Sequence, residues 1–135
     1  MMVREKNAKA DFVVVGGGMA GLCAAVAAAR NGAKTLIIQD RPMFGGNASS
    51  EIRMWICGAH GPNRKETGLL EELQLDNLYF NPELHYTIWD DVMYNFVRQQ
   101  PNLSMLLNSS VESVEVEDGK IRSVTAWNLV EYTRY

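Results

Sequence analysis

The sequence predicts an α/β fold with a parallel sheet and a late antiparallel β-hairpin, and three observations predict it. An apolar run, "FVVV", leads straight into the glycine-rich stretch "GGGMAG" and an alanine-rich segment. A second apolar run, "KTLIIQ", follows at once. Much later, "VESVEVEDGK" alternates valine with acidic residues up to an Asp-Gly pair, which is typical of a hairpin turn.

The first elements are expected in the order strand, helix, strand. Residues 1–9 are expected to form a loose polar leader. Residues 10–15 are expected to be a strand buried on both faces, since such strands are continuous apolar runs. Residues 18–30 are predicted to be helical because alanine favours helix, and Asn31-Gly32 is a typical helix stop. With a buried strand at 34–39, these elements make a right-handed βαβ unit within residues 10–40.

The rest of the chain is expected to complete a single partial domain over residues 1–135. Residues 41–68 are predicted to be a glycine-rich, ligand-facing loop with one short strand or helix at about 50–56. The segment 69–100 is predicted to be helical, with Thr67 as an N-cap and Trp89, Met93 and Phe96 on a core-facing stripe. A buried strand at 103–107 and paired strands at 111–117 and 121–130 make 103–135 a strand followed by a hairpin.

Composition excludes several classes of protein. The 135 residues fit one domain, and a net charge of −3 without a basic stripe predicts no nucleic-acid partner. The polar start has no signal-peptide core, and Leu22 to Ala29 is too short to cross a bilayer, so we expect a cytoplasmic protein with no membrane contact. Two cysteines make no disulfide framework.

Gly16, Gly18 and Gly21 fit the pattern G-x-G-x-x-G. The first glycine permits a tight turn, the second admits a pyrophosphate, and the third lets helix and strand pack closely. The helix start, with Met19 and Ala20, offers free N–H groups to phosphate. Asp40 follows Gly21 by nineteen residues and ends the second strand, where an acid binds ribose hydroxyls. The alternative is a glycine-rich turn without a ligand.

A second glycine pair, Gly45-Gly46, follows Asp40 closely and leads into polar and small residues: Asn47, Ala48, Ser49 and Ser50. A unit that binds only NAD usually passes from this strand to a helix through a short loop. The glycine-rich loop can instead lie along the other side of a pyrophosphate.

The stretches "DFVVVGGGMAG" and "IIQDRPMFGGNAS" resemble the FAD-dependent oxidoreductase family of the glutathione-reductase-like flavoprotein superfamily, over nearly the whole chain. The resemblance implies a Rossmann-like FAD/NAD(P)-binding fold with FAD as cofactor. It implies that Asp40 replaces the usual ribose-binding glutamate and that Gly45-Gly46 lies near the pyrophosphate. It also implies that the backbone near Val111 touches adenine. Arg41, Asn47 and Ala48 are expected to bind the cofactor as well. Family members are several hundred residues long, so we expect a truncated N-terminal part, whose partners would be the missing C-terminal part or a second copy.

Catalytic residues are less clearly indicated. Cys57 in "WICGAHG" fits a small buried residue beside a turn, a flavin-side thiol, or half of a zinc site with His60 and distant His85. Zinc needs more ligands than these, so no metal is predicted. Arg53, Glu51 and His60 lie in the loop that, by resemblance, runs toward the flavin ring, where they could hold that ring or a substrate, or simply be solvated. Ser49 and Ser50 lack the G-x-S-x-G pattern of a nucleophile and are expected to hydrogen-bond FAD.

The sequence therefore predicts the FAD-binding portion of an oxidoreductase that takes a hydride or electron pair from a small-molecule substrate. Two alternatives stay open: an NAD-dependent dehydrogenase, and a non-catalytic fragment that binds FAD or ADP weakly.

Overall fold

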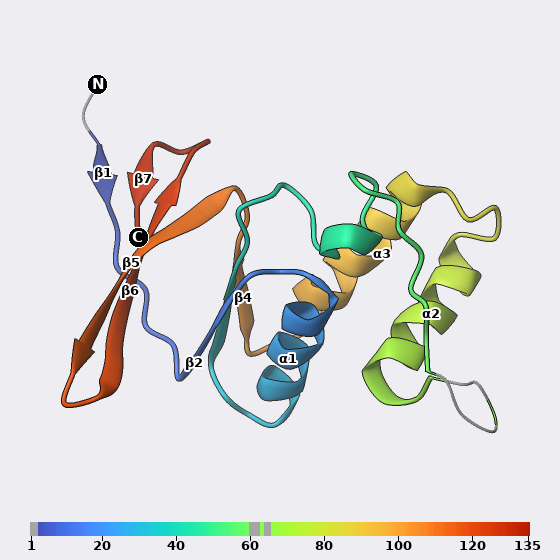
Figure 1. Cartoon of the computed structure of the whole chain (residues 1–135), viewed down its shortest axis with the longest axis horizontal. Helices are drawn as coiled ribbons and strands as arrows, with labels where there is room; N and C mark the ends of the chain where they lie inside the picture. Colours follow the sequence, from blue (N-terminus) through green and yellow to red (C-terminus); the bar gives the residue numbers. More distant parts are fainter. Residues whose placement is uncertain (1–2, 60–62, 64–65) are drawn as a thin grey trace.

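The computed structural model describes residues 3–59, 63 and 66–135, which form two sheets and three α-helices (Figure 1). The first sheet has three parallel strands in the order β2-β3-β4. Its strands are β2 (Phe12–Val15), β3 (Thr35–Ile38) and β4 (Leu103–Leu106). Helix α1 (Met19–Arg30) connects β2 to β3, and Asn31 caps its C-terminus before Gly32 turns the chain with a φ of 92°. The predicted βαβ unit is confirmed.

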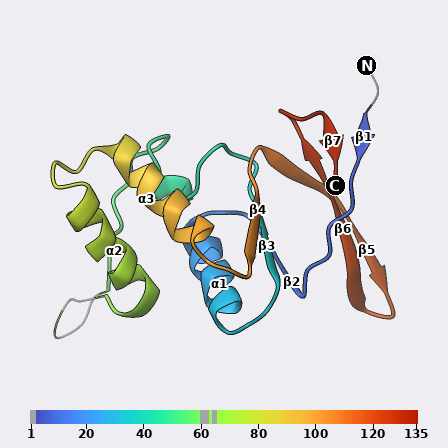
Figure 2. The same cartoon turned by 180° about the vertical axis from the view of Figure 1, so that it is seen from behind.

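The helices cover one side of this sheet, and the second sheet lies on the other side (Figures 1 and 2). Helix α2 (Gly68–Phe80) and helix α3 (Tyr86–Arg98) form a pair beside α1. The predicted stripe of α3 is buried, and it joins residues of α1, α2, β3 and the loop after β3 in one core. That core contains Leu22, Val26, Ile37, Phe44, Leu73, Trp89, Met93, Phe96 and Val97.

The second sheet has the order β1-β7-β6-β5. The long hairpin pairs β5 (Ser109–Glu117) with β6 (Lys120–Asn128) through Asp118 and Gly119, whose φ angles of 50° and 71° fit a type I′ turn. The predicted hairpin is confirmed. Two short strands complete the sheet: β7 (Thr133–Arg134) and β1 (Arg4–Glu5), which pair in parallel.

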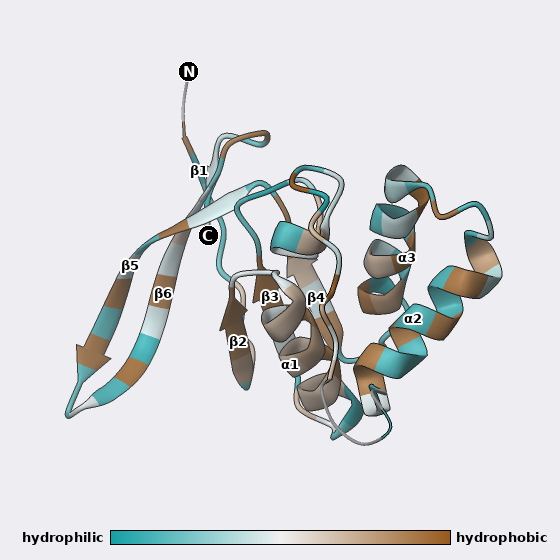
Figure 3. Ribbon diagram, turned by 45° about the vertical axis from the view of Figure 1, so that its right-hand side comes forward, coloured by the Kyte–Doolittle hydropathy of each residue, from teal (hydrophilic) through white to brown (hydrophobic). Residues whose placement is uncertain are grey.

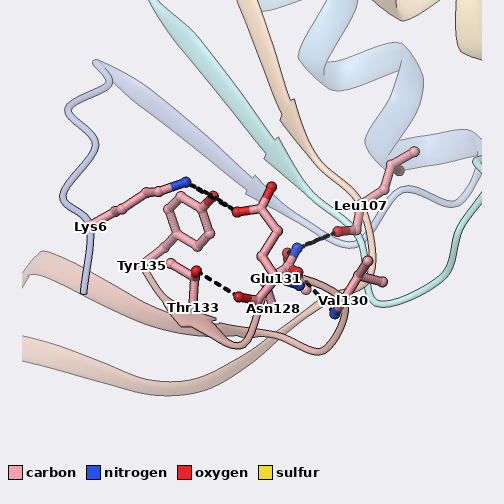
Figure 4. A network of polar contacts seen from close by, with 8 residues as sticks. Lys6, Leu107, Asn128, Val130, Glu131, Thr133 and Tyr135 are labelled. Atoms are coloured by element: carbon pink, nitrogen blue, oxygen red, sulfur yellow. Dashed lines mark hydrogen bonds and ion pairs between the residues drawn. The ribbon is translucent and has the colours of Figure 1, made fainter. Parts of the chain in front are cut away.

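Strand β1 was not predicted. Residues 1–9 were expected to form a loose leader, but Arg4 and Glu5 pair with β7, the last strand of the chain. The Lys6 ammonium lies 3.1 Å from a carboxylate oxygen of Glu131 and donates to the hydroxyl of Tyr135 at 3.2 Å (Figure 4). Alternation of apolar residues could not indicate a strand of two exposed polar residues whose partner lies at the opposite end of the sequence.

The prediction that the first strand is buried on both faces is wrong. Figure 3 shows β2 as strongly hydrophobic, yet Phe12 is 46% and Val15 is 57% exposed. The reason is that β2 is an edge strand of a three-stranded sheet. In addition, Val13 lines a cavity of about 530 Å³ whose wall also includes Val124 of β6.

The loop after β3 also differs from expectation. A short 3₁₀ helix occupies Gly46–Ala48, and residues 50–56 form neither a strand nor a helix. Thr67 does precede α2, but its side chain makes no capping hydrogen bond. Among the described residues, no helix combines the length and apolar character needed to cross a membrane.

Candidate functional site

The first glycine loop turns the chain from β2 into α1. Gly16 has a φ of +102°, and its N–H donates to the carbonyl of Ile38 at 2.8 Å, which ties the turn to the end of β3. A β-carbon on Gly21 would collide with the carbonyl oxygen of Gly16 and lie 3.3 Å from Val14 Cγ1. At Gly18, by contrast, a β-carbon would meet no described atom within 4 Å. The loop is therefore tight inside and open at its middle glycine.

Helix α1 begins directly at this opening. Its first intrahelical bond runs from the N–H of Leu22 to the carbonyl of Gly18 at 2.8 Å. The amides of Met19, Ala20 and Gly21 therefore have no intrahelical acceptor, and the helix dipole adds partial positive charge there. This arrangement suits a phosphate group.

The second glycine pair packs against the first loop. The N–H of Gly45 donates to the carbonyl of Gly17 at 2.8 Å, and Gly18 and Gly45 form a parallel β-bridge. A β-carbon on Gly46 would lie 3.2 Å from Gly18 Cα, and one on Gly45 would lie 2.6 Å from the sulfur of Met93. The two loops, far apart in the sequence, thus form one cradle lined by glycine backbone.

Gln39 holds the two loops together, and the sequence analysis did not identify it. Its side chain is buried, accepts a hydrogen bond from the N–H of Gly17 at 2.7 Å, and donates to the carbonyl of Met43 at 3.1 Å. The Phe44 ring fills the space above Gly17, where a β-carbon would lie 2.6 Å from the ring. A glutamine between an apolar strand and an acid gives no sequence signal of this role.

Asp40 lies at the carboxyl end of β3 and is exposed. Its carboxylate is 3.8 Å from Nε of Arg41, whose guanidinium also approaches Glu51 at 3.7 Å. These long, exposed contacts leave the carboxylate oxygens of Asp40 accessible to hydroxyl donors.

The start of the hairpin is fixed beside this acid. The N–H of Ser109 donates to the carbonyl of Gln39 at 2.9 Å, and the N–H of Asn108 donates to the carbonyl of Arg41 at 3.1 Å. Val111 follows on β5 and is half-buried. The predicted ribose residue and the predicted adenine residue therefore belong to adjoining segments.

The residues after the second glycine pair shape the loop. The hydroxyl of Ser49 is buried and donates to the carbonyl of Gly46 at 2.7 Å, while the indole N–H of Trp89 donates to the carbonyl of Ala48 at 2.9 Å. The N–H of Ser50 donates to Asp90 at 3.0 Å. Asn47 is exposed. Ser49 and Ala48 thus have partners within the protein, whereas the Asn47 side chain faces solvent.

Of the catalytic candidates, Cys57 and Arg53 lie in the part of the chain that the structure describes. Cys57 is exposed, so the interpretation of it as a small buried residue is wrong. Arg53 donates to the carbonyl of Ser50 at 3.1 Å and lies over the Tyr86 ring. His60 lies outside the described residues. Burial raises the pKa of the Cys23 thiol, which keeps it protonated as a packing residue of α1. In the described part of the chain, no three metal-binding side chains cluster.

Comparison with known proteins identifies the family. The sequence profile of the FAD dependent oxidoreductase family matches residues 11–133. The tRNA uridine 5-carboxymethylaminomethyl modification enzymes MnmG of Bacillus licheniformis and Bacillus subtilis are each 31% identical to this chain, over 140 and 134 residues. The alignments cover 90% and 84% of this chain but 22% and 21% of the relatives. The chain therefore spans about a fifth of the length of the curated relatives it matches.

Solved structures share the fold. The myxobacterial chondrochloren halogenase CndH, described as an FAD-dependent halogenase, has a TM-score of 0.60 at 17% identity over 95% of this chain and 34% of its own. GidA of Aquifex aeolicus has a TM-score of 0.54 at 20% identity, covering 97% of this chain and 24% of its own. The predicted Rossmann-like fold is confirmed. The chain belongs to the FAD dependent oxidoreductase family, and its cofactor is FAD.

Proposed function

We propose that this chain is the FAD-binding portion of an oxidoreductase that takes a hydride or electron pair from a small-molecule substrate. The observation that carries the proposal is the cradle at Gly18, where two glycine loops meet around a position that is open to a ligand. When bound, FAD supplies the redox chemistry, and the protein's part is to bind, orient and tune it.

The residues of the cradle receive separate roles in this proposal. The amides of Gly16, Gly18 and residues 19–21 bind the pyrophosphate, and Asp40 accepts hydrogen bonds from the ribose hydroxyls. The backbone of Gly45 and Gly46 and the side chain of Asn47 approach the ligand from the second loop, and the backbone near Val111 contacts adenine. Arg41 orients Asp40, while Ala48 and Ser49 act through the shape of the loop.

A nucleic-acid substrate is the second candidate, because the two curated relatives are named for modifying tRNA. Against it, the chain carries a net charge of −3, whereas nucleic-acid binding depends on clustered basic residues. We therefore expect no retention of tRNA by this chain in a filter-binding assay at physiological salt. Salt-dependent retention of tRNA would favour the second candidate.

Reduction of the bound flavin tests the proposed activity. The FAD-loaded chain would be mixed anaerobically with a panel of neutral and charged small molecules while the visible flavin absorbance is followed. The proposal predicts bleaching by members of one chemical class. Bound FAD that no donor in the panel bleaches, while dithionite bleaches it fully, would favour the non-catalytic alternative. In that case the partner needed for activity would be sought in a longer protein or a second copy of this chain.

A further inference from the structure

A cavity of about 420 Å³ opens beside the second glycine loop, between residues 54–56 and the helices α2 and α3. Small-molecule sites commonly measure about 300–1,000 Å³. Ala48 and Trp89 contribute to its wall, and the hydrogen bond between them joins the cavity to the candidate FAD loop. The cavity is therefore next to the cradle but separate from Gly18.

Three aromatic side chains line this cavity: Trp55, Tyr86 and Trp89. The hydroxyl of Tyr86 already donates to the carbonyl of Arg53 at 2.9 Å, and the indole N–H of Trp89 is bonded to Ala48. Trp55 comes from the loop and is 66% exposed. Tyr86 and Trp89 thus have their polar groups engaged and offer apolar ring surface, while Trp55 exposes a large ring at the entrance.

Three amide side chains also line the cavity: Gln74, Asn77 and Asn81. Asn81 is buried and bonded on all sides, to both backbone polar groups of His85 and to Oδ1 of Asn77. In the part of the chain that the structure describes, Nδ2 of Asn77 and the whole amide of Gln74 make no hydrogen bond. Together they offer both donors and an acceptor to a ligand.

No described residue that lines the cavity is charged, although charged residues make up 21% of the chain. The Arg53 guanidinium lies 5.8 Å from the centre of the Tyr86 ring, but its Nε is bonded to Ser50 and it does not line the cavity. A charged ligand would find no counter-ion among the described residues that line this cavity. The cavity therefore suits a neutral ligand.

We propose that this cavity is a subsite for a neutral polyhydroxylated ring, as in a sugar or cyclic polyol. Such a ring has an apolar C–H face that packs on Trp55 and hydroxyls that both donate to and accept from Gln74 and Asn77. The inference rests on the proposed function in one respect: it makes this ring the substrate class of the oxidoreductase, because the cavity adjoins the loop assigned to FAD.

Binding of neutral methyl glycosides tests the inference. The probes are the methyl glycosides of glucose, galactose, mannose and xylose, with glucuronate as a charged ring. Indole serves as a flat apolar ring, and because it fluoresces itself its binding is followed by calorimetry. Because the chain has three tryptophans, the variant Trp127→Phe leaves fluorescence only from the two that line the cavity. We expect a saturable change in tryptophan fluorescence with at least one glycoside. The affinity for glucuronate should be at least about tenfold lower than the affinity for that glycoside. Failure of all four glycosides, or equal binding of glucuronate or indole, would overturn the inference.

Two surface variants locate the binding. Trp55→Ala is expected to lower the affinity of the responding glycoside about three- to tenfold in calorimetric titrations, since it removes a stacking ring. Tyr79→Ala removes an aromatic ring that is 80% exposed on α2 and does not line the cavity, so it should leave the affinity unchanged. An equal effect of the two substitutions would contradict the assigned location.

Titrations with and without FAD separate this inference from the proposed function. Glycoside binding to a chain that never retains FAD would leave the subsite standing and refute the proposed function. FAD retention without glycoside binding would refute the subsite and leave the proposed function standing. Displacement of the glycoside by FAD would assign the cavity to the cofactor and overturn the inference.

Discussion

A β-carbon on Gly21 would collide with the carbonyl oxygen of Gly16, so the first and third glycines of the G-x-G-x-x-G pattern lie in direct contact. Gly16 in turn bonds the end of β3 through its N–H. The approach of α1 to the sheet therefore depends on the absence of a side chain at Gly21, five residues after the turn begins.

Gly21→Ala is expected to destabilise the protein by about 1–3 kcal/mol, because α1 must shift away from the turn to admit the methyl group. Urea unfolding followed by circular dichroism measures this. Gly18→Ala is the matched control, since Gly18 has a φ of −63° and open space at its β position. Because Gly18 is the N-cap of α1, its loss of stability should stay below about 1 kcal/mol. Equal stability of the Gly21→Ala variant and the wild type would contradict the packing described.

Gln39→Ala should cost about 1–3 kcal/mol, because it leaves the buried N–H of Gly17 without its acceptor. It should also weaken FAD binding, since the bond between Gly17 and Gln39 aligns the two glycine loops. Urea unfolding measures the loss of stability, and titration with FAD measures the affinity. An FAD affinity unchanged in a destabilised variant would show that the loops keep their alignment without Gln39.

Gln39→Glu separates the two hydrogen bonds of this side chain. The introduced carboxylate can still accept from Gly17, but it cannot donate to the carbonyl of Met43 unless it is protonated. We therefore expect the destabilisation relative to wild type to be larger at neutral pH than near pH 5. A pH-independent difference in unfolding free energy would contradict the role assigned to the Met43 carbonyl.

Asn128 anchors the end of β6 to the connection between β4 and β5 (Figure 4). Its buried amide donates to the carbonyl of Leu107 and the hydroxyl of Ser109, both at 2.9 Å, and accepts from the N–H groups of Val130 and Glu131 at 3.1 and 2.7 Å. Asn128→Ala should lower the unfolding free energy by about 2–3 kcal/mol, because several buried polar groups lose their partners.

Asn128→Asp provides the matched comparison. It keeps the acceptor for Val130 and Glu131 but removes the donors to Leu107 and Ser109. Hydrogen exchange should then increase first at the Ser109 amide, which bonds Gln39 beside the cradle. Faster exchange confined to residues 130 and 131 would contradict this assignment.

Glu72 links α2 to α1 through a two-pronged ion pair with Arg30, at 2.6 and 2.7 Å. The hydrogen bonds from Arg30 lower the pKa of the Glu72 carboxyl. A carboxyl with a lowered folded-state pKa stabilises the fold above its unfolded pKa, and this contribution is lost as the pH falls through the folded-state value. Because both side chains are partly exposed, the pair is expected to contribute only about 0.5–1 kcal/mol.

Glu72→Gln should therefore be less stable than wild type by about 0.5–1 kcal/mol at pH 7. This difference in unfolding free energy should disappear as the pH falls well below about 4. Unfolding free energies at several pH values measure it. Glu83→Gln is the control, because the Glu83 side chain is 79% exposed and its carboxylate pairs with His85, so a small, separate effect is expected. A constant difference for Glu72→Gln down to acidic pH would contradict the ion pair's contribution.

The parts predicted well from sequence are those whose signals are local. The βαβ unit follows from an apolar run, alanine content and a glycine pattern, and the hairpin follows from Asp118-Gly119 between alternating strands. Burial of β2 was overestimated, because whether a strand is central or at an edge depends on sheet order rather than on its own residues.

The contacts that were not predicted are long-range. Gln39 reaches Gly17 across 22 residues, and Lys6 reaches Glu131 across 125. Neither pair has a composition signal, since both consist of ordinary polar residues whose partners are set by the folded chain. Each of the two glycine loops was predicted from the sequence, whereas the contact between Gly46 and Gly18 is seen only in the folded structure.

The most direct test of the central claim is the flavin absorbance that stays with the chain after it is mixed with FAD and passed through gel filtration, for wild type and Gly18→Ala. The account predicts that wild type retains FAD, and that Gly18→Ala, equally folded by circular dichroism, loses it because the added methyl group occupies the place of the pyrophosphate. Equal retention of FAD by the two proteins, or a folded wild-type chain that retains none, would contradict the claim that the cradle at Gly18 holds the cofactor.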